Sequence, residues 1–375
     1  MENPFVFGEP VRGGRFIDRE AELDRLKQYL KNSRNVIIYS PRKYGKTSLV
    51  IRALEDQEEE MLTVFIDCYA ITSVKELAKA LSRKVLRHYR EKELFEAVKR
   101  LFLRISPRIT IRTMPEILVE VEYAGEEEWE ESFELPQRLA TDKQIPVAVV
   151  FDEFQELAQF ESLLKSLRTA FQHHNRVAYV FIGSRRHMME WIFQAKESPF
   201  YNFGAHMTLR EIPKDAFSGY ILSSFAEADI AIAEDTVDAL LALSACHPHY
   251  TQRLCFDLWY RGKIRGEITQ SDLDAVLGEV IADLEDSYLT IWGSLTPNQK
   301  KVLLAVAQGE GDLFSGTFVR AYDFRSPASV QSALRKLIEK EIVAETGGTY
   351  RLSDIFMGYW LKQRFVGEAR LSAGS

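Results

Sequence analysis

Residues 35–50 read NVIIYSPRKYGKTSLV, and this stretch decides how the rest of the chain is interpreted. The β-branched run NVIIY predicts a buried strand, and the helical pattern KTSLVIRALED follows directly after the turn SPRKYG. Gly45-Lys46-Thr47 is the ending of the phosphate-binding motif GxxxxGKS/T, placed between a strand and a helix as that motif requires. The stretch therefore predicts a site for nucleotide phosphates.

The residue types of this loop suit phosphate chemistry. Backbone N–H groups and the positive end of the following helix favour phosphate oxygens, and Gly45 lets the backbone approach them without a Cβ. Lys46 is expected to reach the β and γ phosphates, and the Thr47 hydroxyl to ligate Mg²⁺. Ser40 departs from the motif, which has a glycine there. The predicted nucleotide-binding loop comprises Ser40, Pro41, Arg42, Lys43, Tyr44, Gly45, Lys46, Thr47 and Ser48.

The segment VVFDEF (149–154) is predicted to supply carboxylates to the same site. It is an apolar strand that ends in Asp152 and Glu153, and ligands of open α/β sheets lie outside the carboxyl ends of the strands. Asp152 is expected to hold Mg²⁺, and Glu153 to orient and deprotonate the attacking water. An acidic strand end in an ordinary turn is the alternative, and the neighbouring loop favours the catalytic interpretation.

Ser184, Arg185 and Arg186 follow the apolar strand VAYVFIG. The serine hydroxyl could contact the γ-phosphate or the attacking water, and either arginine could neutralise transition-state charge in its own subunit or in a neighbour's site. Alternatively, Ser184 caps the next helix and both arginines are solvated. The sequence leaves both interpretations open and does not separate the two arginines.

The composition indicates an ordinary globular protein. The chain has 375 residues, of which 46% are hydrophobic and 27% charged, so disordered and fibrous proteins are excluded and two or three domains are expected. A net charge of −7 argues against an evenly basic nucleic-acid coat. Cys68, Cys246 and Cys255 lack CxxC spacing, which favours free thiols. Because no export signal or membrane-spanning run is present, we expect a cytoplasmic protein.

The order of strands and helices predicts three domains. Residues 1–213 alternate apolar strands with amphipathic helices, which predicts an α/β core with a parallel sheet covered on both faces. Within it, residues of about 105–135 alternate apolar and polar side chains and predict an inserted hairpin that turns at Gly125. Residues 214–295 predict an all-helical lid. Residues 296–375 predict three helices and a terminal hairpin, the order of a winged helix-turn-helix.

Five segments in this order resemble one protein family. The chain is similar to the archaeal-type AAA+ ATPases, P-loop proteins that also occur in bacteria and are allied to STAND and Orc/Cdc6-like proteins. The resemblance covers nearly the whole chain. The segments are FIDREAEL (16–23), YSPRKYGKTSLV (39–50), VVFDEFQEL (149–157), FIGSRRHMMEWIF (181–193) and HPHYTQRL (247–254).

The resemblance implies an ATPase core, a helical lid and a winged helix, with ATP and Mg²⁺ bound between the first two. It implies that Lys46 and Thr47 are Walker A residues, Asp152 and Glu153 the Walker B pair, and Ser184 the sensor-1 residue. Serine is frequent in the family at the position of Ser40. The resemblance also implies further contacts with the nucleotide, from Pro248 in the lid and from an aromatic residue near the N-terminus.

Two further interpretations stay open. Phe5 or Phe7 could stack on the adenine, or serve as a hydrophobic staple where the chain enters the first helix. Arg253 could sense the γ-phosphate, although an ordinary surface arginine fits its place in the sequence slightly better.

The winged-helix segment differs in charge from the rest of the chain. Residues 296–375 hold eleven Lys/Arg and eight Asp/Glu, an excess of three positive charges in a chain of net charge −7. Arg335 and Lys336 lie on the predicted recognition helix, with Arg325 before it and Arg351 in the wing, and these four are expected to contact double-stranded DNA. A winged helix that docks a protein, or one that is a passive part of the fold, is the alternative.

These observations together predict an ATP-hydrolysing AAA+ protein that binds ATP or ADP and acts as a nucleotide-driven switch or loader, on DNA through its winged helix. The alternative is a STAND-like signalling switch whose winged helix docks a protein partner. Both a monomer and a homo-oligomer agree with the sequence.

Overall fold

The computed structural model describes residues 2–11, 16–102, 108–112, 118–123, 127–346 and 348–366. The chain forms two compact units, Val6–Ala216 and a second that joins Met1–Phe5 to Phe217–Ser375. Within the described residues, no helix is both long and apolar enough to cross a membrane. The three cysteines are free, as the sequence predicted.

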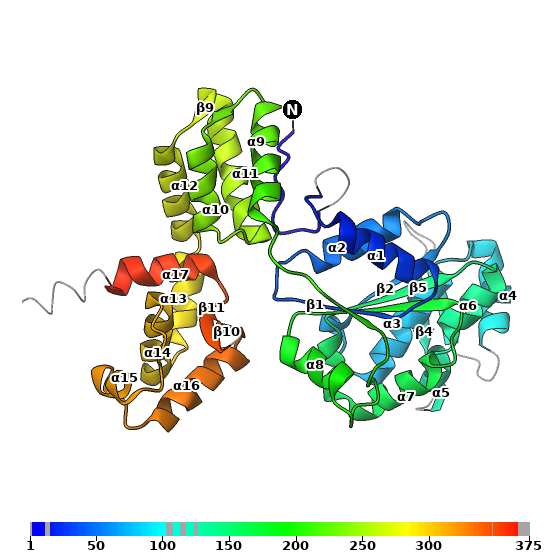
Figure 1. Ribbon diagram of the computed structural model, residues 1–375. Helices are drawn as coiled ribbons and strands as arrows, with labels where there is room; N and C mark the ends of the chain where they lie inside the picture. The colour runs from blue at the N-terminus through cyan, green and yellow to red at the C-terminus, as the bar shows by residue number, and fades with distance from the viewer. Residues whose placement is uncertain are drawn as a thin grey trace, which may run out of the picture. The chain divides into compact units, whose positions relative to one another are not determined.

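A five-stranded parallel sheet forms the centre of the Val6–Ala216 unit (Figure 1). Its strands are hydrogen-bonded in the order β2-β5-β6-β1-β7, and every pair runs parallel. The inner strands are buried along almost their whole length, which explains their continuous apolar sequences. The predicted α/β core is confirmed. The strands are β1 (Val36–Tyr39), β2 (Leu62–Asp67), β5 (Val147–Asp152), β6 (Val177–Gly183) and β7 (Ala205–Thr208).

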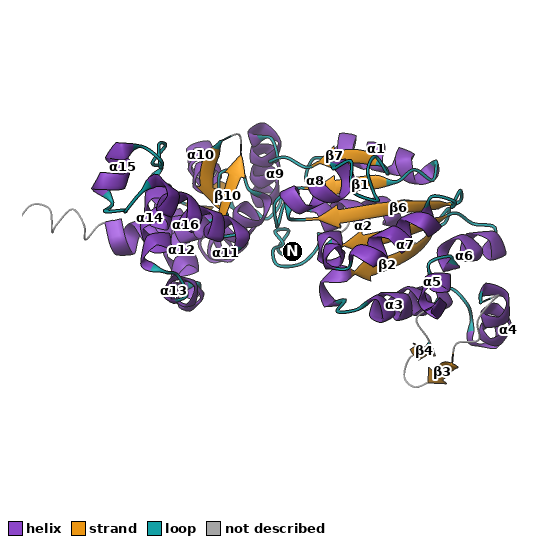
Figure 2. Cartoon of the chain, turned by 90° about the horizontal axis from the view of Figure 1, so that it is seen from below, coloured by secondary structure: helices purple, strands orange, loops and turns teal. Residues whose placement is uncertain are grey.

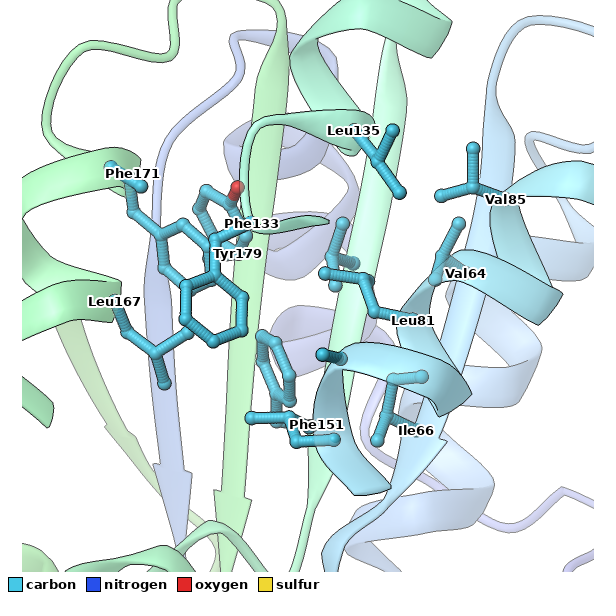
Figure 3. Close-up of a cluster of buried hydrophobic side chains, with 14 of the residues drawn as sticks. Val64, Ile66, Leu81, Val85, Phe133, Leu135, Phe151, Leu167, Phe171 and Tyr179 are labelled. Atoms are coloured by element: carbon cyan, nitrogen blue, oxygen red, sulfur yellow. The ribbon is translucent and has the colours of Figure 1, made fainter. Parts of the chain in front are cut away.

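Helices cover both faces of this sheet. On one face, leucines of α1 (Glu20–Lys31) and α2 (Lys46–Glu55) form a hydrophobic cluster with alternate residues of the strands, including Val36, Ile38 and Val150. A larger cluster fills the other face (Figure 3). Helices that contribute to that cluster include α3 (Val74–Leu86), α4 (Glu91–Leu101), α6 (Leu135–Lys143), α7 (Glu161–Phe171) and α8 (Arg186–Gln194).

Aromatic side chains dominate the larger cluster. The rings of Phe171 and Tyr179 stack with centroids 3.9 Å apart, and Phe151 lies between Phe171 and Phe181 at 5.9 Å from each. Leu81 of α3 belongs to the same cluster from the helical side (Figure 3). These rings pack on β5 and β6, which pair in parallel and end next to the predicted catalytic residues.

An antiparallel hairpin lies outside the main sheet (Figure 2). Its strands, β3 (Arg108–Arg112) and β4 (Leu118–Glu122), follow α4 (Glu91–Leu101) and precede α5 (Glu127–Ser132). Arg112 pairs with Leu118, so the chain reverses between them. The prediction of a turn at Gly125 was therefore wrong, and Gly125 itself lies outside the described residues. The glutamate-rich sequence after Gly125 favours a helix, although its apolar and polar residues alternate weakly.

The second unit begins with helices and includes the N-terminal residues of the chain. Phe5 is buried against Tyr220 and Phe225 of α9, with ring centroids 5.8 and 5.0 Å away. Tyr220 OH also donates a hydrogen bond to Pro4 O at 3.2 Å. For Phe5, both earlier interpretations were therefore wrong, because the ring fills the helical core. The elements are α9 (Lys214–Ala226), β8 (Ala231–Ile232), α10 (Glu234–Leu243), α11 (Pro248–Arg265), β9 (Glu267–Ile268) and α12 (Gln270–Asp283).

The C-terminal part of this unit contains three helices and a hairpin in winged-helix order, but the chain does not end with the hairpin. A further helix, α17 (Ile355–Leu361), follows it, whereas the sequence predicted that the hairpin is the terminal element. Asp354 caps α17, and Phe356, Met357, Trp360 and Leu361 bury one face of it, which is helical spacing. The other elements are α13 (Glu285–Gly293), α14 (Pro297–Gln308), α15 (Gly316–Ala321), α16 (Pro327–Glu339), β10 (Val343–Thr346), β11 (Thr349–Leu352) and η4 (Lys362–Val366).

The packing of α3 leads to a prediction about stability. Leu81 is fully buried, so Leu81→Ala should lower the free energy of unfolding by about 2–5 kcal/mol. Arg83→Ala, on the exposed side of the same helix, should change it by less than about 0.5 kcal/mol. Urea denaturation of the two variants checks this. Equal losses would show that α3 does not pack on the sheet through Leu81.

Candidate functional site

The loop Ser40–Ser48 connects β1 to α2 at the carboxyl end of the sheet. Gly45 has a positive φ of 85° and is the N-cap of α2, so the backbone takes a left-handed turn where the motif needs glycine. Lys46 is only 6% exposed, and its Nζ donates hydrogen bonds to Ser40 O at 2.8 Å and to Pro41 O at 2.9 Å. The ammonium group is thus held across the loop, over the start of the helix.

A hydrogen bond joins this loop to the acidic end of β5. Thr47 Oγ1 donates to Asp152 Oδ2 at 2.9 Å, and Asp152 Oδ1 accepts from the backbone N–H of Glu153 at 3.0 Å. Burial raises the pKa of Asp152 above its usual value, while the Thr47 hydrogen bond and the charge of Lys46 act in the opposite direction. The structure thus brings together the residues predicted from two motifs more than one hundred positions apart.

Asp67 adds a third carboxylate to this edge of the sheet. It is the last residue of β2 and is the register partner of Asp152. Asp67 was not among the predicted site residues, although in FIDCY (65–69) it follows an apolar strand just as Asp152 does in VVFDEF. Asp67 and Asp152 lie side by side because β2 pairs with β5, and this pairing cannot be read from the sequence.

Glu153 is anchored by its neighbours. Its backbone is left-handed, with φ of 52°, and its Oε2 accepts hydrogen bonds from Ser184 Oγ at 2.8 Å and from Gln155 Nε2. The alternative that Ser184 caps the next helix is wrong, because Arg185 is the N-cap of α8 and gives no side-chain cap. Ser184, predicted from the end of β6, and Glu153, predicted from the end of β5, therefore meet.

The two predicted arginines make different ion pairs. Arg185 Nη1 lies 3.5 Å from Glu156 Oε1, and Arg186 Nε lies 2.8 Å from Glu190 Oε1 within α8. The Arg186 side chain is 61% exposed and that of Arg185 is 32% exposed. Both follow β6 directly.

Pro248 and Arg253 belong to the second unit. Pro248 is the first residue of α11, after His247, whose Nδ1 accepts a hydrogen bond from His249 N at 3.3 Å. Arg253 pairs with Asp257 and Asp283 of the same unit at 2.9 and 3.0 Å. The predicted contacts of Pro248 and Arg253 with nucleotide remain predictions.

Arg19 fastens the nucleotide-binding loop and was not among the predicted site residues. It is 5% exposed, and its Nη2 donates to Tyr44 O at 3.2 Å and to Arg210 O at 2.8 Å. Tyr44 OH in turn donates to Glu211 Oε1 at 3.2 Å. The tip of the loop is thus tied both to the start of α1 and to the segment after β7. Within FIDREAEL, the arginine is indistinguishable from a surface residue until its burial is known.

Comparison with known proteins identifies the family. Residues 16–221 match a family described as an ATPase domain predominantly from Archaea. The chain belongs to this family of archaeal ATPases. Residues 286–363 also match a family described as a probable winged helix domain. This archaeal-type protein is an ATPase with a P-loop core and a C-terminal winged helix, as the sequence predicted.

Solved structures share this fold at low sequence identity. The Walker-type ATPase PABY2304 of Pyrococcus abyssi aligns with a TM-score of 0.66 and 19% identity, over 96% of this chain and 99% of that one. The Aeropyrum pernix ORC2 protein, in ADPNP–ADP complexes, aligns with a TM-score of 0.60 and 11% identity over 99% and 97%. The Aeropyrum pernix ORC1 protein, in complex with DNA, aligns with a TM-score of 0.51 and 16% identity over 94% of each chain. A search of curated proteins found no match.

The Arg19 contacts lead to a prediction for this archaeal-type ATPase. Arg19→Met removes a buried charged donor from Tyr44 O and Arg210 O, and should lower the free energy of unfolding by about 1.5–3 kcal/mol. It should also weaken nucleotide binding, because the loop loses its fastening. Arg25→Met, on the exposed side of α1, is the matched control. Urea denaturation and nucleotide titration of both variants measure the effects. Equal stability and equal nucleotide affinity in the two variants would show that Arg19 does not support the nucleotide-binding loop.

Proposed function

We propose that this ATPase hydrolyses ATP at the carboxyl edge of the sheet and uses its nucleotide state to drive a switch or loader that acts on DNA through the winged helix. The hydrogen bond of 2.9 Å between Thr47 Oγ1 and Asp152 Oδ2 carries the proposal for the site. It joins the phosphate-binding loop to the acidic strand end that hydrolysis requires.

The loop is proposed to bind the phosphates. Lys46 would bind β and γ phosphate oxygens, and the backbone N–H groups from Arg42 to Ser48, at the N-terminus of α2, would bind the rest. Gly45 supports this role because its left-handed conformation exposes the backbone and no atom lies within 4 Å of where its Cβ would be.

Mg²⁺ fits the two oxygen groups next to the loop. Thr47 and Asp152 offer a hydroxyl and a carboxylate already in contact, and Mg²⁺ prefers one or two protein oxygens together with phosphate oxygens. Thr47 and Asp152 would hold the ion, which when bound neutralises negative charge on the phosphates.

Glu153 is proposed as the general base. Its carboxylate would take a proton from a water molecule whose oxygen forms a bond to the γ-phosphorus, while the bond from that phosphorus to the bridging oxygen of ADP breaks. Ser184, which donates to Glu153 Oε2, would help to hold that carboxylate beside the same water.

Arg185 and Arg186 are proposed as sources of the positive charge that stabilises the transition state. The more exposed Arg186 suits a role in the site of a neighbouring subunit, and Arg185, beside Glu156, suits a role in its own. Pro248 is proposed to contact the nucleotide from the helical unit.

Two substitutions test the site. Lys46→Ala should abolish ATP binding or hydrolysis, because it removes the cation for the β and γ phosphates. Glu153→Gln should retain ATP binding and lose hydrolysis, because the amide keeps the shape of the side chain but accepts no proton. Phosphate release and a fluorescent-nucleotide titration measure the two properties.

Lys31→Ala and Glu161→Gln are matched controls, since both residues form exposed ion pairs away from the loop. If folded Lys46→Ala protein hydrolysed ATP at the control rate, the assignment of hydrolysis to this loop would be wrong. Complete loss of ATP binding in Glu153→Gln protein would make Glu153 a structural residue instead of the base.

The exposed cations of the winged helix support DNA as the partner. Arg335 and Lys336 lie on the exposed side of α16, with Arg325 before it and Arg351 on β11. In the described part of the winged helix, Arg325, Arg335 and Arg351 form no ion pair, whereas Lys336 Nζ lies 2.7 Å from Glu339 Oε2. Three unpaired arginines favour a phosphate backbone, and the structurally similar ORC1 protein was solved in complex with DNA.

DNA binding should depend steeply on salt. Each phosphate contact contributes a slope of about −0.9 to log K against log salt, so Arg335→Ala combined with Lys336→Ala should weaken duplex binding and reduce the slope by about 1–2. ATP turnover should stay near that of the wild type, since neither residue belongs to the hydrolytic site.

Fluorescence anisotropy over a salt series measures the slope, with Lys362→Ala in η4 as the control. If the unaltered protein shows no duplex affinity at low salt, with or without ATP, the DNA proposal fails and a protein partner replaces it.

A further inference from the structure

The side-chain amide of Gln155 contacts the predicted base, Glu153. The left-handed backbone at Glu153 turns the chain out of β5 into η3 (Phe154–Gln159), and this turn brings Gln155 back against the Glu153 carboxylate. Gln155 is 1% exposed, and its Nε2 donates to Glu153 Oε2. That oxygen also accepts from Ser184 Oγ. One carboxylate oxygen therefore receives two side-chain donors.

The other carboxylate oxygen is available as a proton acceptor. Among the residues that the structure places, none donates a hydrogen bond to Glu153 Oε1. A general base needs an unoccupied lone pair directed at the proton that it removes. Two donors on Oε2 fix the plane of the carboxylate and leave Oε1 for this task.

The opposite end of the Gln155 amide has no partner. Gln155 Oε1 is buried without a hydrogen bond, and it lies against Gly183, where a Cβ would come within 2.6 Å of it. A buried polar atom without a partner destabilises a fold. Methionine or leucine would occupy a similar volume without that cost, so packing alone does not explain an amide at this position.

We propose that Gln155 is a positioning residue for ATP hydrolysis, which together with Ser184 holds Glu153 Oε2 so that Oε1 receives the proton of the attacking water. The inference rests on the proposed function of Glu153 as the base. It assigns the amide to catalysis at the expense of stability.

Gln155→Met is the test, because it removes the donor and also the unpartnered oxygen. The kcat for ATP should fall by about 10- to 100-fold, as for loss of a group that orients a reactive one. The KM and the nucleotide affinity should stay unchanged, because Gln155 touches the base and not the loop. The melting temperature should stay equal or rise. A residue needed only for packing would give the reverse result, with lower stability and normal kcat.

Gln159→Met is the matched control, since Gln159 is an exposed amide of the same η3 turn that donates to Glu156 O. It should keep the wild-type kcat. Gln155→Leu is a second variant with the same expectation as Gln155→Met. Normal kcat in either folded Gln155 variant, or failure of both to fold, would overturn the inference.

The outcome of Glu153→Gln separates this inference from the proposed function. If Glu153→Gln is inactive and Gln155→Met is fully active, only the positioning role is overturned. If Glu153→Gln still hydrolyses ATP, the base assignment fails, and the role of Gln155 fails with it.

Discussion

The parallel direction of five strands is the constraint on which the rest of this ATPase depends. It places the carboxyl ends of β1, β5 and β6 at one edge, so that residues far apart in the chain meet there. It also requires helices on both faces, because the strands are apolar on both sides. The bond from Thr47 to Asp152 is possible only because this edge is shared.

Much of the fold and of the site could be predicted because the residues of each motif are consecutive in the sequence. The nucleotide-binding loop is one run of nine residues, and Asp152 and Glu153 follow one apolar strand. Burial on both faces selects β-branched and aromatic residues. The inner strands can therefore be recognised from the sequence without knowledge of the strands that pair with them. Ser184 was found for the same reason, as the polar residue that ends such a strand.

The missed features depend on contacts that the sequence does not contain. Arg19 is buried against backbone carbonyl groups of the nucleotide-binding loop and of the segment after β7, and Gln155 reaches Glu153 only through a left-handed turn. Phe5 packs on a helix more than two hundred residues away. The hairpin turn was misplaced because alternation over a few residues cannot separate a strand from a glutamate-rich helix, which has enough propensity of its own.

The sheet order has a consequence for a chain that is still being synthesised. β1 carries the loop, and both of its neighbours, β6 and β7, are made long after it. At about 5–20 residues per second, roughly 10–30 s pass between synthesis of the loop and of Glu211, which binds Tyr44 at its tip. At the start of that interval the nascent chain has the phosphate-binding loop but not β6, β7 or the Asp152 carboxylate to which Thr47 is bonded. A ligand that binds only the finished core stabilises it by mass action after the sheet has formed.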